Sequence, residues 1–161
     1  MTFRHAARTI TLVRSQPIAI DVLDRESFLR YGETIELVQP DLGKRSRGED
    51  DYQVLTRIPS TGWRLALHCV RVRWTDVLYV CNNRRIFTPQ YGTTLICVAL
   101  PRRTENVQVF LLDRSVMLNS EIPHCLLTLS AESWVQVGES FDTQAREIKL
   151  RRTLVPAVLW H

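Results

Sequence analysis

Two segments that pass from turn residues into apolar runs constrain the fold of this chain most strongly. The first contains Pro89 and Gly92 and continues into residues 95–100, which are apolar throughout. The second, farther along the chain, places His124 directly after a proline and ahead of a leucine-rich stretch. A short, wholly apolar run predicts a strand that is covered on both faces. Together the segments predict a small β-barrel with a pocket organised around His124.

The remainder of the chain supports an all-β architecture. Short apolar stretches separated by turn residues recur at roughly 8- to 12-residue spacing, which is typical of a sandwich or barrel. The predicted strands cover residues 9–13, 18–22, 34–38, 52–56, 63–73, 77–81, 107–112, 115–118, 126–129 and 134–137. Asn82 and Asn83 predict a tight turn after the strand that ends at residue 81.

One short helix is predicted over residues 25–30, with Asp24 as its N-cap and Gly32 as its C-terminal stop. Residues 41–51 are polar and predict a loop. Residues 141–152 suit either a helix or an extended arm. Residues 154–160 are apolar enough to need burial, for which a second subunit is one candidate.

Length and composition indicate one domain spanning residues 1–161. The chain is 45% hydrophobic and 24% charged, and no apolar run approaches the roughly 20 residues that cross a bilayer. The N-terminus lacks the apolar core of a secretory signal, so we expect a cytoplasmic location. We also expect that the protein does not bind a membrane. Nineteen of the 21 basic residues are arginine, but they alternate with acids, which argues against a nucleic-acid partner.

The cysteines and histidines do not suggest a metal centre. Cys69, Cys81, Cys97 and Cys125 show no Cys-x-x-Cys spacing and are expected to be reduced. A catalytic metal usually needs three clustered protein ligands, and only His68 and His124 lie away from the chain ends. We therefore expect no metal and no other cofactor.

Several of these polar residues are candidates for chemistry. His124 suits general acid or base work because the pKa of histidine lies near neutrality; a structural hydrogen-bonding role is the alternative. His68 lies in the middle of an apolar strand and is expected to be structural. Arg71 and Arg73 share one face of that strand by alternation, where they would meet either an anion or solvent. Arg85 follows the asparagine turn and is placed to frame a pocket mouth or to remain exposed.

Four stretches resemble the ureidoglycolate lyase family. They are Leu-Asp-Arg-Glu-Ser-Phe-Leu-Arg-Tyr-Gly-Glu-Thr-Ile-Glu at 23–36, Ile-Phe-Thr-Pro-Gln-Tyr-Gly at 86–92, Thr-Leu-Ile-Cys-Val-Ala-Leu-Pro at 94–101 and Ile-Pro-His-Cys-Leu-Leu at 122–127. Residues 67–72 are also similar to a strand of the family that carries an arginine, which would be Arg71 here, and the resemblance places His124 on the family's histidine. The chain departs from the family in having Pro123 where the family has tryptophan. It also lacks the family's hairpin histidine, with Asn83 nearby, and has Arg85 in place of a glutamine.

The resemblance implies a fold and an activity. The fold is a cupin-like double-stranded β-helix, or jelly-roll barrel, with one or two short helices, and the family is often homodimeric. The activity is a metal-independent lyase reaction that releases urea and glyoxylate from ureidoglycolate, so the expected partner is a small carboxylate-bearing substrate. Two alternatives stay open: a cyclase, isomerase or dehydratase of a specialised biosynthetic pathway, and a non-catalytic binding or dimerisation module. The predicted catalytic residues are His124, Arg85 and Arg71, and the predicted substrate-binding residues are Asn83, Tyr91 and Trp134.

Overall fold

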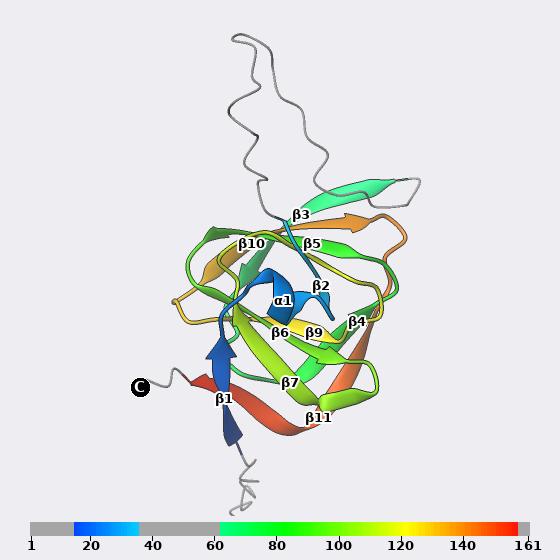
Figure 1. The fold of residues 1–161 in the computed structure, drawn as a ribbon. Coiled ribbons are helices and arrows are strands. Elements are labelled where there is room, and N and C mark those ends of the chain that lie inside the picture. The colour runs from blue at the N-terminus through cyan, green and yellow to red at the C-terminus, as the bar shows by residue number, and fades with distance from the viewer. Residues whose placement is uncertain (1–14, 36–61, 158–161) are drawn as a thin grey trace, which may run out of the picture.

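A computed structural model describes residues 15–35 and 62–157, which form a strand-rich fold with one short helix (Figure 1). The elements in chain order are β1 (Ser15–Asp21), α1 (Arg25–Phe28), β2 (Gly32–Thr34), β3 (Trp63–Val70), β4 (Thr75–Cys81), β5 (Arg85–Tyr91), β6 (Thr94–Leu100), β7 (Arg103–Leu111), β8 (Val116–Leu118), β9 (His124–Thr128), β10 (Ser133–Ser140) and β11 (Ala145–Ala157). The strands predicted at 9–13 and 52–56 and the loop predicted at 41–51 lie outside the described residues.

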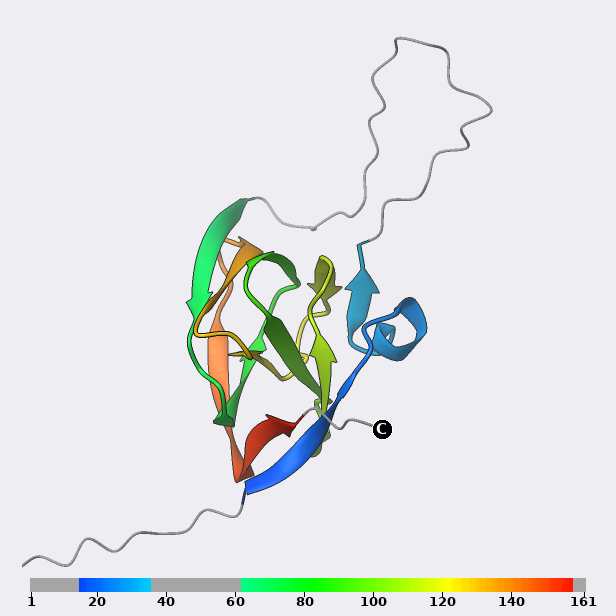
Figure 2. The ribbon, with the colours of Figure 1, turned by 90° about the vertical axis from the view of Figure 1, so that its left-hand side faces the viewer.

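The strands form two sheets. A closed barrel has the order β1-β11-β4-β9-β6-β7, and a second sheet has the order β2-β8-β5-β10-β3. Figure 2 shows α1 and β2 on one side of this arrangement and β3 on the other. The expectation of a mainly β fold that contains a barrel and one or two short helices is confirmed by the described residues.

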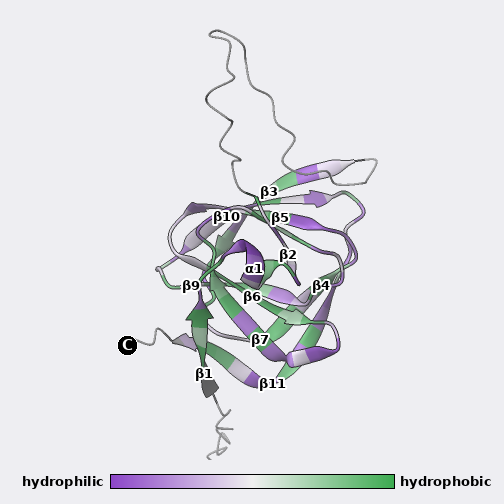
Figure 3. Ribbon diagram, in the orientation of Figure 1, coloured by the Kyte–Doolittle hydropathy of each residue, from purple (hydrophilic) through white to green (hydrophobic). Residues whose placement is uncertain are grey.

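Strand β6 lies at the centre of the hydrophobic core. Residues 94–99 are all buried, as predicted for a strand covered on both faces. Ile96 and Val98 belong to a cluster that includes residues of the second sheet, whereas Leu95 and Cys97 belong to a cluster drawn from the barrel strands. Figure 3 shows hydrophobic colour on barrel strands such as β1 and on parts of β7, where hydrophilic bands interrupt it. Burial of each aliphatic side chain stabilises the fold by about 1.5–3 kcal/mol. Because the side chains of β6 enter both clusters, this strand fixes the two sheets relative to each other.

The predicted helix begins as expected but ends differently. The Asp24 carboxylate accepts a hydrogen bond from the Ser27 backbone N–H at 2.8 Å, and a capping box is complete. The helix ends at Phe28, so the prediction that Gly32 stops it is wrong. Gly32 instead opens β2, where a Cβ would lie 1.9 Å from the Met117 carbonyl oxygen. This position requires glycine because two strands approach closely there.

Two other segments correct the sequence predictions. Pro89 was expected to mark a turn, yet it lies inside β5 next to a β-bulge, where proline is tolerated. Gly92, with φ of 73°, makes the turn that follows. The segment after residue 144, predicted as helix or arm, is the long strand β11, and Leu154 is buried within its own barrel. Within the described residues, no helix is long and apolar enough to cross a membrane.

Candidate functional site

A cavity of about 330 Å³ opens where β3, β4, β5 and β9 meet. Its lining includes polar side chains from several strands: His68, Arg71, Thr75, Tyr79, Arg85 and His124. Their strands are neighbours, because β4 pairs with β9 and β10 joins β3 to β5. His124 lies opposite Tyr79 in the β4–β9 register.

Strand alternation explains why these side chains point inward. On β3, His68 lies on the same face as Val70, which is buried. On β5, Arg85 shares a face with Phe87, which is also buried, and the Arg85 guanidinium lies 5.1 Å from the Phe87 ring centroid. The cavity therefore combines apolar walls with a few polar groups, as small-molecule sites usually do.

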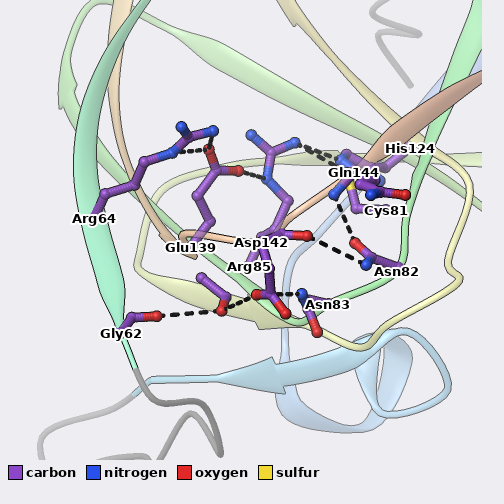
Figure 4. A network of polar contacts seen from close by, with 11 residues as sticks. Gly62, Arg64, Cys81, Asn82, Asn83, Arg85, His124, Glu139, Asp142 and Gln144 are labelled. Atoms are coloured by element: carbon purple, nitrogen blue, oxygen red, sulfur yellow. Dashed lines mark hydrogen bonds and ion pairs between the residues drawn. The ribbon is translucent and has the colours of Figure 1, made fainter.

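Arg85 is held by contacts on three sides (Figure 4). Its Nε lies 2.9 Å from Glu139 Oε2, and its Nη1 lies 3.2 Å from His124 Nε2 and 3.6 Å from Cys81 Sγ. Nη2 has no hydrogen-bond partner among the described residues, and the side chain is 19% exposed. One end of the guanidinium is thus fixed, and the other can donate to a molecule in the cavity.

Glu139 connects Arg85 to a second arginine. Its Oε1 accepts hydrogen bonds from Arg64 Nε at 2.9 Å and Nη2 at 2.7 Å. One carboxylate, which is 8% exposed, therefore lies between two guanidinium groups. The group of three carries a net charge of +1 beside the cavity. The Arg64 side chain is 50% exposed, whereas that of Arg85 is 19% exposed, so the Arg85 charge is the one that a bound anion would stabilise most.

His124 is neutral and both of its ring nitrogens are engaged. Burial lowers the pKa of His124 to about 4, with a further lowering from Arg85 that the bond to Ile122 opposes. Because arginine can only donate, Nε2 accepts from Arg85, and Nδ1–H donates to the Ile122 carbonyl at 2.8 Å. His124 therefore fixes the direction of the Arg85 guanidinium.

His68 differs from His124 in each of these respects. It lines the cavity, it is exposed, and its ring nitrogens make no hydrogen bond within the described part of the chain. Partial desolvation, and then the charge of Arg85, lower the pKa of His68. A neutral imidazole with a free nitrogen can accept a proton from a bound molecule. The expectation that His68 is a satisfied structural residue is wrong.

The structure brings together only some of the predicted site residues. His124 and Arg85 are in contact and face the cavity. Arg71 lies at the mouth, beyond the end of β3, and pairs with Glu132 at 2.9 Å. Asn83 lies outside the cavity lining, where its Nδ2 donates to Asp142 Oδ1 at 3.1 Å.

Tyr91 and Trp134 also lie away from the cavity, on the outer face of the second sheet. Val135 pairs with Pro89 while Trp134 pairs with Tyr91, so Gln90 is an extra residue in β5. This bulge reverses the alternation, and Tyr91 is 67% exposed instead of pointing inward with Phe87. Trp134 donates through Nε1 to Glu132 at 3.2 Å.

Two site residues were missed in the sequence, although alternation carried a signal for both. His68 lies two positions before Val70, so a buried Val70 implies an inward His68. Glu139 continues the inward positions Val135 and Val137 of β10, but the predicted strand stopped at residue 137.

The described residues contain no group of three or more histidine, cysteine, aspartate or glutamate side chains placed to hold a metal ion. All four cysteines are free thiols. Burial raises the pKa of the Cys81 thiol beside Arg85, so it stays protonated near neutral pH.

Comparison with known proteins gives little further guidance. No protein-family model matches the chain, and no curated protein matches it. Among solved structures, it is similar to a vicilin from Solanum melongena, with 18% sequence identity and a TM-score of 0.42. That match covers 54% of this chain and 24% of the vicilin chain.

Proposed function

We propose that the cavity binds a small carboxylate-bearing molecule through Arg85 and that the protein is a metal-independent lyase of the ureidoglycolate type. The observation that carries the proposal is the free Nη2 end of Arg85, held toward a cavity that lies beside a net positive charge. A planar guanidinium donates to both oxygens of a carboxylate, which makes it the better choice for this group than a lysine.

The reaction needs one proton to move within the substrate. In ureidoglycolate a hydroxyl, a carboxylate and a ureido nitrogen share one carbon. Removal of the hydroxyl proton forms the carbonyl of glyoxylate as the C–N bond breaks, and the same proton is delivered to the departing nitrogen of urea. A single neutral base that becomes a general acid suffices, and no oxidant or reductant is consumed.

We assign the proton transfer to His68 and a positioning role to His124. His68 has free ring nitrogens on the cavity, whereas the nitrogens of His124 are taken by Arg85 and Ile122. The lowered pKa of His68 keeps its imidazole neutral near pH 7, in the form that accepts a proton. Arg71 is less suited than Arg85 to the carboxylate because its side chain is 66% exposed at the cavity mouth, where solvent screens its charge, whereas that of Arg85 is 19% exposed.

The direct test is a turnover assay with ureidoglycolate that measures urea and glyoxylate together. Purified protein should release both in equal amounts. His68→Gln should lower kcat by about 10²–10⁴-fold, the usual contribution of one acid–base group. Arg102→Gln, on an exposed turn outside the cavity, is the matched control and should retain full activity.

Two outcomes would count against the proposal in different ways. Absence of urea release from the wild-type protein would reject the lyase reaction, while leaving carboxylate binding to be measured separately. Full activity in His68→Gln would reject the role of His68.

A further inference from the structure

A second, smaller concavity of about 140 Å³ lies away from the main cavity and shares no lining residue with it. Its walls come from the residues after α1, the end of β6 and residues 103–108 of β7. The lining consists of Arg30, Tyr31, Leu100, Arg103, Asn106 and Gln108. Five of these six side chains carry polar groups, and none is a carboxylate.

The two arginines of this concavity have no acidic partner. Neither Arg30 nor Arg103 makes an ion pair with any described residue. The Arg30 guanidinium lies 5.8 Å from the Tyr31 ring centroid and interacts with the Tyr31 side chain by hydrogen bonding and charge, which partly offsets the raising of the Tyr31 pKa by burial. Asp21 is near enough to influence Tyr31 electrostatically, but it forms no ion pair with either arginine. Two exposed arginines therefore line one small space that has no carboxylate in its lining.

The floor of the concavity adds neutral donors. The buried Tyr31 hydroxyl donates to Gln108 Oε1, which leaves the Gln108 Nε2–H₂ group without a partner among the described residues. The Asn106 amide also makes no hydrogen bond there. Burial raises the pKa of Tyr31, so its hydroxyl stays a donor and keeps Gln108 in this orientation.

We propose that this concavity, formed by Arg30, Arg103, Asn106 and Gln108, is a binding site for a phosphate group. Each guanidinium can bind two oxygens in its plane, and a tetrahedral phosphate presents oxygens to two such groups and to an amide at once. The site goes beyond the proposed lyase function, because it lies apart from Arg85 and His68. The phosphate could belong to a soluble molecule or to a lipid headgroup, since both present the same oxygens.

Calorimetric titration of the full chain with inorganic phosphate at low ionic strength tests the site. Arg103→Gln and Arg30→Gln should each weaken phosphate binding by about tenfold or more, the value of one charge-assisted hydrogen bond. Arg102→Gln is the matched control, because it removes one exposed positive charge from the residue beside Arg103 without touching the lining. In an Arg85→Gln background, which keeps the main cavity from contributing to the titration, Arg103→Gln should weaken phosphate binding by the same factor.

Sedimentation with vesicles separates the two sources of phosphate. Binding to phosphatidylcholine vesicles that contain phosphatidic acid, lost in Arg103→Gln and absent with phosphatidylcholine alone, would support the site with a lipid ligand. Binding of free phosphate alone would support it with a soluble ligand. The proposal is overturned if neither form binds, or if Arg102→Gln weakens binding as much as Arg103→Gln does.

Discussion

His124 gives the folded protein a pH-dependent stability that follows from its surroundings. The side chain is 3% exposed, and burial lowers its pKa from 6.5 to about 4. In the unfolded chain the imidazole is hydrated and titrates near its ordinary value. As the pH falls from 6.5 toward 4, the unfolded state therefore takes up a proton before the folded state does. The free energy of unfolding should decrease over this window by about 3 kcal/mol through His124, at about 1.4 kcal/mol for each pKa unit.

Urea denaturation of the wild type and His124→Gln, at neutral pH and at about pH 4.5, isolates this contribution. Glutamine can still donate to Ile122 and accept from Arg85, but it does not titrate in this range. The variant should therefore lose less stability on acidification than the wild type, and His68→Gln should retain most of the wild-type loss. Equal losses in wild type and His124→Gln, or an NMR titration of His124 near its ordinary pKa, would refute the reasoning.

The paired charges and the close strand approach give two further predictions, each measured by denaturant unfolding. Glu139→Gln should lower the free energy of unfolding by about 3 kcal/mol, because it leaves the mostly buried Arg85 without its carboxylate; a loss below about 1 kcal/mol would show that solvent replaces the pair. Gly32→Ala should cost about 2–3 kcal/mol, because the added Cβ would collide with the Met117 carbonyl oxygen. Gly138→Ala, whose Cβ would meet nothing closer than 3.6 Å, is the matched control and should change stability by less than about 0.5 kcal/mol. Equal effects of the two alanines would contradict the steric account.

The fold could be predicted from the sequence where local patterns determine it. Residues 95–99 of the apolar run are buried on both faces, and the Asp24 cap starts the helix at the predicted residue. Close approach between distant strands could not be predicted in this way. Gly32 was interpreted as a local helix stop. Glycine is required at this position because a Cβ would collide with the Met117 carbonyl oxygen, which lies more than eighty residues away in sequence.

The site was predictable only in part for the same reason. Arg85 and His124 were both singled out in the sequence, yet their contact depends on the pairing of β4 with β9 and of β5 with β10. Tyr91 was predicted to bind the substrate. The bulge at Gln90 turns its side chain outward, and this bulge could not be predicted because it depends on the register between strands. Alternation along β10 indicates that Glu139 points inward, but not that its carboxylate pairs with Arg64 and Arg85. Those ion pairs depend on the way that β3, β5 and β10 lie side by side.

Isothermal titration of glyoxylate into the wild type and Arg85→Gln tests the central claim most directly. The variant should fold, because Glu139 keeps its hydrogen bonds to Arg64. Its affinity for glyoxylate should be weaker by about tenfold or more, the value of one charge-assisted hydrogen bond. Arg71→Gln removes an exposed, already paired charge and should change the affinity by less than about fivefold. Equal affinities in wild type and Arg85→Gln would contradict the assignment of this cavity to a carboxylate ligand.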